Sequence, residues 1–277
     1  MYKLIAIDLD GTLLNKNKEI TKENRVFLEK LIDLGYEIVI ATGRRYFSAK
    51  MLIKSIDRHM IILANNGNNV RKSEDDEVVF TKYLDQYDYK NVIQEGRKRS
   101  LHPIVHVDYF LEGYDMIIED NSCHVLNNLF NDDTRIKVIP SSLIYDIDRV
   151  LAIVFADKAI ILDNFYQEIN KKYPNKFSTH VLGNVDIAEA MFEVMNPLGS
   201  KWISLFEYAN TIGVKSDEII AIGDDNNDLE MILNAGLGIA MKNATSTVKE
   251  AANVISERDN NNSGVAFELS KILGIEV

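Results

Sequence analysis

Short apolar runs alternate with segments of helical periodicity along the first third of the chain. The segment Lys3–Ile7 reads as a strand covered on both faces, and further strands are expected at 37–41 and 60–64. A helix is expected between Thr21, a typical N-cap, and Gly35, a typical stop, because apolar residues recur there at helical spacing: Phe27, Leu28, Leu31 and Leu34. This alternation predicts right-handed βαβ units and a parallel sheet.

The pattern changes after residue 65. Val70–Phe80 reads as a hairpin with a charged tip. The stretch from about 82 to 190 then mixes expected strands and helices in a different order, with strands at 104–107, 116–119, 136–139 and 150–155 and helices at 85–100, 122–130 and 159–173. This stretch is predicted to be a separate α/β module inserted into the first domain.

After Pro197, short apolar runs again alternate with segments of helical periodicity. A helix at 200–212 precedes strands at 218–222, 237–241 and 254–255, with helices between and after them. The chain is therefore predicted to be an α/β protein with a Rossmann-like parallel-sheet core formed by residues 1–82 and 191–277. Residues 83–190 are expected to form the inserted α/β domain.

Composition and charge narrow the classes of partner. The 277 residues are 46% hydrophobic and carry a net charge of −11, which disfavours nucleic acid and anionic membranes as partners. A single cysteine, Cys123, cannot form an internal disulfide. Neither a targeting segment nor an apolar run of membrane-spanning length is seen, so the expected location is the cytoplasm. The oligomeric state is not predicted.

Acidic residues follow the first predicted strand, in the segment Asp8-Leu-Asp-Gly-Thr12. A spacing of two points both carboxylates the same way along an extended chain, and Gly11 permits a sharp turn after them. Two neighbouring carboxylates repel each other unless a cation lies between them, and Mg²⁺ is a hard cation that prefers oxygen ligands. The alternative is a solvated turn after a strand.

Other polar groups are expected at the same edge of the sheet, because ligands bind beyond the carboxyl ends of parallel strands. Thr42 and Gly43 end the second strand and could hold phosphate oxygens, although Thr-Gly is also a common strand exit. The segment Gly223–Asp228 opens a helix with three acids, which capping explains only in part. Lys201 begins another helix, where a lysine opposes the helix dipole.

These groups together match the needs of phosphoryl transfer. Asp8 would act as the nucleophile and form an acyl phosphate, and Asp10 would protonate the leaving group and then activate water. Asp224 and Asp8 would hold Mg²⁺, while Lys201 would neutralise phosphate charge and pair with the acids.

The motifs resemble those of the haloacid dehalogenase-like superfamily, and within it the Cof-type phosphatases with a type IIB cap. They occur in the family order: Asp8-Leu-Asp-Gly-Thr-Leu-Leu14, Ala41-Thr-Gly-Arg44, Asn66-Gly67-Asn68, Glu193-Val-Met-Asn-Pro-Leu-Gly-Ser-Lys201, Gly223–Met231 and Gly238-Ile-Ala-Met-Lys-Asn-Ala244. The resemblance implies a mobile cap that sets specificity, and Asp10 as a metal ligand through its main-chain carbonyl. It also implies phosphate contacts from the Leu9 backbone, Thr42, Gly43, Lys201 and Asn227, with Asp228 orienting Lys201 or metal-bound water.

The expected function is therefore Mg²⁺-dependent hydrolysis of small phosphate monoesters, such as a sugar phosphate or a similar metabolite. A phosphomutase and a non-catalytic phosphometabolite-binding protein on the same fold are the alternatives. Two positions depart from the family pattern, Trp202 after the lysine and Ser263 near the carboxyl end. The histidines of the inserted domain lack metal-like spacing and are expected to be structural: His102, His106, His124 and His180.

Overall fold

A computed structural model describes residues 1–120, 135–185 and 188–276. The chain divides into two compact units, one formed by Met1–Thr81 with Ser200–Val277 and the other by Lys82–Gly199. We call the first unit the core and the second unit the insert. The expected helix at 122–130, with Cys123 and His124, lies outside the described residues.

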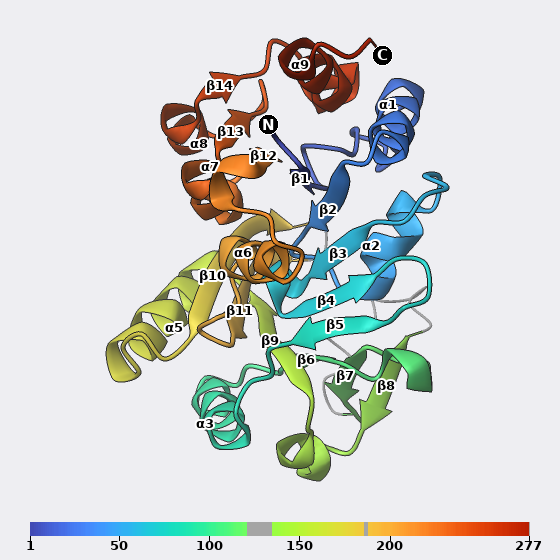
Figure 1. The fold of residues 1–277 in the computed structure, drawn as a ribbon. Coiled ribbons are helices and arrows are strands. Elements are labelled where there is room, and N and C mark those ends of the chain that lie inside the picture. The colour runs from blue at the N-terminus through green and yellow to red at the C-terminus, as the bar shows by residue number, and fades with distance from the viewer. Residues whose placement is uncertain (121–134, 186–187, 277) are drawn as a thin grey trace. The chain divides into compact units, whose positions relative to one another are not determined.

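The core is an eight-stranded sheet with helices (Figure 1), in the strand order β14-β13-β12-β1-β2-β3-β4-β5. Its elements are β1 (Leu4–Asp8), α1 (Lys22–Asp33), β2 (Glu37–Ala41), α2 (Tyr46–Ile53), β3 (Ile61–Ala64), β4 (Asn69–Lys72), β5 (Val78–Thr81), α6 (Lys201–Thr211), β12 (Ile219–Gly223), α7 (Leu229–Asn234), β13 (Leu237–Ala240), α8 (Ser246–Ala251), β14 (Val254–Ile255) and α9 (Gly264–Leu273). The strands from β14 to β3 are parallel, and β4 and β5 add an antiparallel edge.

Strand β1 lies in the middle of this sheet because it can be buried on both faces. Its residues Leu4–Ile7 are fully buried, as the unbroken apolar run predicts. The chain first builds β2 and β3 on one side of β1 and later builds β12, β13 and β14 on the other. The strand order therefore reverses between β1 and β12, and the carboxyl ends of these two neighbouring strands form the crevice where open α/β sheets bind ligands.

The insert has its own six-stranded sheet, in the order β10-β11-β9-β6-β7-β8. Its elements are α3 (Gln86–Arg97), β6 (Ile104–Val107), β7 (Met116–Glu119), β8 (Ile136–Ile139), β9 (Val150–Asp157), α5 (Ala159–Lys172), β10 (Ser178–Val185) and β11 (Ala188–Met195). Helix α5 packs on β9, β10 and β11, and its Phe165 meets Phe155 and Phe192 edge to face at 5.2 Å between ring centroids. The insert therefore has its own aromatic core.

The α/β fold with a parallel core sheet and a second α/β module is confirmed. The insert nevertheless extends to Gly199, beyond the expected boundary at residue 190. The reason is that β11 pairs with both β9 and β10 as far as Met195, so it belongs to the insert's sheet.

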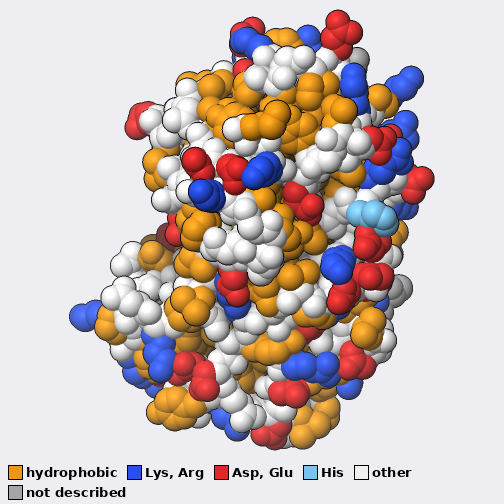
Figure 2. All heavy atoms as spheres, in the orientation of Figure 1, with side chains coloured by type: hydrophobic (Ala, Val, Ile, Leu, Met, Phe, Trp, Pro, Cys, Tyr) orange, Lys and Arg blue, Asp and Glu red, His pale blue; other side chains and the backbone are white. Residues whose placement is uncertain are grey.

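Acidic and basic groups are interspersed over the face shown in Figure 2. Among the described helices we found none that combines the length and the apolar character needed to cross a bilayer.

Candidate active site

Three carboxylates meet at the carboxyl ends of β1 and β12. Asp8 is the last residue of β1, and Asp224 and Asp228 lie in the turn after β12. One oxygen of each of these three side chains lies within 4.8 Å of the others. The pairing of β1 with β12 brings them together across more than two hundred residues of sequence, as the motif positions predict.

Lys201 is the buried cation of this cluster. Its Nζ donates to Oδ1 of Asp8 at 2.7 Å and to Oδ1 of Asp228 at 2.6 Å, and its side chain is fully buried. Burial alone would lower the pKa of Lys201, but the charges of Asp228 and Asp8 outweigh it and raise the pKa above its ordinary value. Lys201 is therefore held in its charged form in the first turn of α6, where the helix dipole disfavours a lysine.

The carboxylates still outnumber the cations that face them. Burial raises the pKa of Asp8 well above its ordinary value; Lys201 opposes this rise, while Asp228 and Asp224 add to it. Burial also raises the pKa of Asp224 to about 7, against the hydrogen bond from Thr12. Three carboxylates around one ammonium leave an excess of negative charge that a divalent cation would neutralise.

The three carboxylates differ in the partners they already have. Asp228 accepts bonds from Lys201 through Oδ1 and from the backbone N–H groups of Asp224 and Asp225 through Oδ2. Oδ2 of Asp8 makes no hydrogen bond to the described residues. Asp8 and Asp224 therefore have the coordinating capacity for a metal, and Asp228 instead fixes Lys201 and the turn that carries Asp224.

The Asp10 side chain points to a different set of partners. Its carboxylate accepts two bonds from Arg44, at 2.6 and 2.7 Å, and one from Lys18 at 2.7 Å. Burial would raise the pKa of Asp10, but the bonds from Arg44 and Lys18 outweigh it and lower the pKa. The sequence reasoning missed both cations as partners of Asp10. Arg44 lies in the motif Ala41–Arg44, whereas no motif marks Lys18.

The remaining predicted residues lie just beyond the carboxyl ends of β1, β2 and β12. Thr42 is buried, and its hydroxyl accepts from the Arg44 N–H at 3.1 Å. The Asn227 amide donates at 3.1 Å to Oδ1 of Asn66, which also faces Gly43. Leu9 is fully buried between Asp8 and Asp10. Asn66 thus connects the turn after β12 to the turn after β2, a role that sequence reasoning had not given it.

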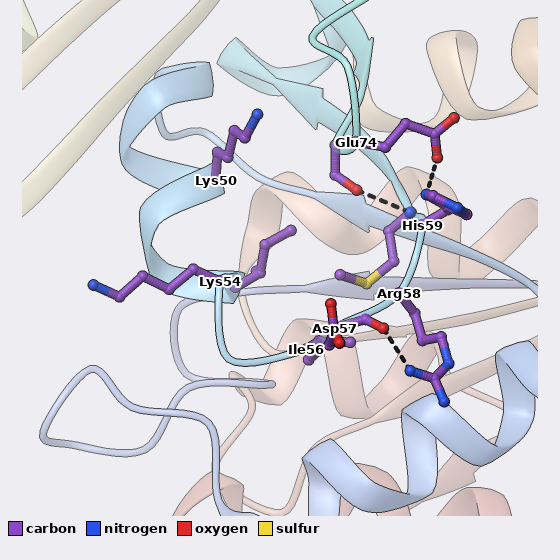
Figure 3. Close-up of a pocket in the computed structure, with 10 residues that line it drawn as sticks. Lys50, Lys54, Ile56, Asp57, Arg58, His59 and Glu74 are labelled. Carbon is purple, nitrogen blue, oxygen red and sulfur yellow. Dashed lines mark hydrogen bonds and ion pairs between the residues drawn. The ribbon is translucent and has the colours of Figure 1, made fainter.

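A separate cavity of about 410 Å³ opens between the end of α2 and the start of β3 (Figure 3). Met60, which lines it, precedes β3, so the cavity lies toward the amino ends of the parallel strands and away from Asp8. Three of its basic side chains contact carboxylates: His59 contacts Glu74, Lys50 contacts Asp76, and Arg58 contacts Asp33. We therefore do not assign it to the chemistry of the acid cluster.

Known proteins are similar to this chain along nearly its whole length. Residues 5–269 match the family of haloacid dehalogenase-like hydrolases. "Putative phosphatase YxeH" of Bacillus subtilis is 30% identical over 99% of both chains, and the 5-amino-6-(5-phospho-D-ribitylamino)uracil phosphatase YwtE of the same organism is 27% identical over 98% of both.

A solved structure of a haloacid dehalogenase-like hydrolase from Bacteroides thetaiotaomicron is similar in fold, with a TM-score of 0.80 and 28% identity. The match covers 98% of this chain and 100% of that structure. Together with the acid cluster at the switch point of the core sheet, these matches show that the chain belongs to the haloacid dehalogenase-like hydrolase family.

Proposed function

We propose that this protein is a Mg²⁺-dependent phosphatase that hydrolyses small phosphate monoesters through a phospho-aspartate on Asp8. The observation that carries the proposal is the buried cluster in which Lys201 bonds Asp8 and Asp228 beside Asp224. Relatives named as phosphatases support the reaction class. Sugar phosphates and similar metabolites are the proposed substrates, and the cytoplasm is the proposed location.

The donor set fits a hard divalent cation. Asp8, Asp224 and the main-chain carbonyl of Asp10 offer oxygen atoms only, which suits Mg²⁺. When bound, Mg²⁺ would neutralise charge on the phosphate and on the two carboxylates. Thr12 donates to Oδ1 of Asp224 at 2.8 Å, which orients that carboxylate before any ion arrives.

In the first half-reaction, a carboxylate oxygen of Asp8 attacks the phosphorus, and the bond between phosphorus and the ester oxygen breaks. Lys201 lowers the pKa of Asp8 against the effect of burial and faces the phosphate with a positive charge. The backbone of Leu9, the Thr42–Gly43 turn and Asn227 contribute further donors to the phosphate. In the second half-reaction, water attacks the phosphorus of the acyl phosphate and releases inorganic phosphate and free Asp8.

Asp10 supplies the proton for the leaving alkoxide and later takes one from the attacking water. Its bonds to Arg44 and Lys18 favour the ionised carboxylate, so they disfavour the acid form. We propose that this paired arrangement is the resting state. Asp10 must leave at least one of these partners, in exchange for substrate, before it can carry the proton.

The insert is proposed to act as a cap that sets substrate specificity. Every candidate for the chemistry lies in the core, in residues 8–44 or 201–228. A second domain joined to the core by only two segments of chain can move as a hinged body and exclude water. The insert would therefore select among metabolites without contributing a nucleophile.

The metal requirement is the direct test of the proposal. We expect inorganic phosphate to be released from an aryl phosphate in the presence of Mg²⁺, to stop when a chelator is added and to resume when Mg²⁺ is restored. Calcium should inhibit, because its larger and looser coordination shell misplaces the nucleophile. Full activity in excess chelator would contradict the proposal.

The same assay separates the alternatives and narrows the substrate. A phosphomutase would transfer the phosphoryl group between sugar positions and release little phosphate, and a binding protein would release none. To narrow the substrate, phosphate release should be measured with a panel of phosphorylated metabolites. The panel should include 5-amino-6-(5-phospho-D-ribitylamino)uracil, since relatives at 26–27% identity are named for its hydrolysis.

Replacing Gly11 by alanine should remove most of this activity. Gly11 has a φ of +80°, and an added Cβ would lie 2.2 Å from Oδ2 of Asp224, so that carboxylate would have to move. Gly35→Ala is the matched control, because Gly35 has a φ of +90° but open space around its Cβ. Both variants should lose about 1 kcal/mol of unfolding free energy from backbone strain.

Phosphate release and thermal unfolding of the two glycine variants should be measured side by side. Only Gly11→Ala is expected to lose activity. Equal activity in the two variants would show that Asp224 need not occupy the position it has here.

A further inference from the structure

The loop after β13 is hydrogen-bonded to the backbone at Asp224. The N–H of Met241 donates to Gly223 O at 3.0 Å, and the N–H of Thr245 donates to Asp224 O at 2.9 Å. Both ends of the loop 241–245 are therefore tied to the backbone that carries Asp224. Asn243 lies at the middle of this loop.

Asn243 reaches from this loop to the turn that follows Asp8. Its Nδ2 donates to the carbonyl of Gly11 at 2.8 Å and lies 3.5 Å from Oδ2 of Asp224. One amide group thus joins the turn after β1 to the turn after β12. These are the two turns between which the proposed metal would be held.

A second asparagine holds Asn243 in place. The backbone N–H of Asn260 donates to Oδ1 of Asn243 at 3.2 Å, which leaves the Asn243 Nδ2 facing Gly11. The side chain of Asn260 donates to Leu14 O at 2.8 Å, so the loop 259–262 is anchored to the same turn. Asn243 therefore has a fixed orientation although it lies at the surface.

We propose that Asn243 is a positioning residue that sets the separation between the Asp8–Thr12 turn and the Asp224 carboxylate and thereby tightens Mg²⁺ binding. The inference rests on the proposed function, because it concerns the metal held by Asp8 and Asp224. Groups that orient metal ligands typically change metal affinity by about 10- to 100-fold. An exposed amide with one short bond should act at the lower end of that range.

Calorimetric titration of the metal-free, full-length protein with MgCl₂ tests the proposal without using activity. Asn243→Ala should raise the Mg²⁺ dissociation constant about tenfold. Asn262→Ala is the matched control, because among the residues that the structure describes the Asn262 amide donates to Asp259 alone, at 2.7 Å within its own loop. Asn262→Ala should bind Mg²⁺ within about twofold of the parent.

Two further measurements exclude a merely structural effect. The metal-free melting temperature of Asn243→Ala should match that of Asn262→Ala, and its phosphatase activity should return to the parent kcat at saturating Mg²⁺. If Asn243→Ala unfolds, Asn243→Ser is used instead, because the serine hydroxyl is too short to reach Gly11 O.

The outcomes separate this inference from the proposed function. A parent-like Mg²⁺ affinity in the folded Asn243 variant would overturn the inference while leaving the metal site intact. An activity loss that saturating Mg²⁺ does not restore would overturn it as well. If the parent protein itself does not bind Mg²⁺, the proposed function fails first, and the inference fails with it.

Discussion

Replacing Asp8 by asparagine is expected to lower phosphate release by roughly 10⁴- to 10⁶-fold, the range over which losing one member of a catalytic triad lowers kcat. An amide oxygen is a poor nucleophile toward phosphorus and a weaker metal ligand than a carboxylate. The substitution keeps the size and shape of the side chain at the end of β1, where Asp8 pairs with Ala41 of β2. It also removes one negative charge from a cluster in which burial already raises the pKa of Asp8.

The metal-free Asp8→Asn protein should therefore be as stable as the parent, which separates chemistry from folding. Lys201 keeps its bond to Asp228 in this variant. Asp33→Asn is a suitable control, because Asp33 is an exposed residue of α1 that pairs with Arg58. Mass spectrometry after acid quenching should detect a phosphoryl group on the parent and on Asp33→Asn only. Substantial turnover by Asp8→Asn, with contaminating phosphatase excluded, would contradict the covalent mechanism.

The alternation of apolar runs was sufficient to predict most of the core fold. The strand at 37–41 and the helix capped by Thr21 appear where the periodicity places them, because buried parallel strands and amphipathic helices have distinct patterns. The hairpin of β10 and β11 was not predicted. Its first strand, Ser178–Val185, mixes polar and apolar residues without clean alternation, so neither period is visible.

The motifs were sufficient to predict which side chains lie close together at the strand ends, but not the contacts that depend on side-chain direction. Motif spacing placed Lys201 near Asp8, and they meet at 2.7 Å across 193 positions. The engagement of Asp10 by Lys18, and the bridge from Asn243 to Gly11, depend on how loops cross beyond the strand ends. Lys18 lies outside every motif, and the motif that contains Asn243 does not say which group its amide meets.

Replacing Lys201 by methionine should cost both catalysis and stability. Lys201 is the cation that faces Asp8 and Asp228, and its removal leaves two buried carboxylates without it. Breaking a buried ion pair in this way typically costs about 3–5 kcal/mol of unfolding free energy. Phosphate release should fall by about 10²- to 10³-fold or more, because the phosphate also loses a preorganised positive group.

Lys271→Met is the matched control for that variant. Lys271 is an exposed residue of α9 that pairs with Glu257 at 2.7 Å and lies 3.9 Å from the Glu268 carboxylate, and an exposed ammonium of this kind contributes only about 0–1 kcal/mol per pair. Denaturant unfolding of both variants without metal should show a large loss for Lys201→Met alone. Adding Mg²⁺ should recover part of that loss, because the ion would neutralise Asp8 in place of the ammonium. If Lys201→Met is as stable as Lys271→Met, the negative charges of the buried carboxylates do not need Lys201 to neutralise them. The charge excess that motivates the metal proposal would then be smaller than three carboxylates around one ammonium imply.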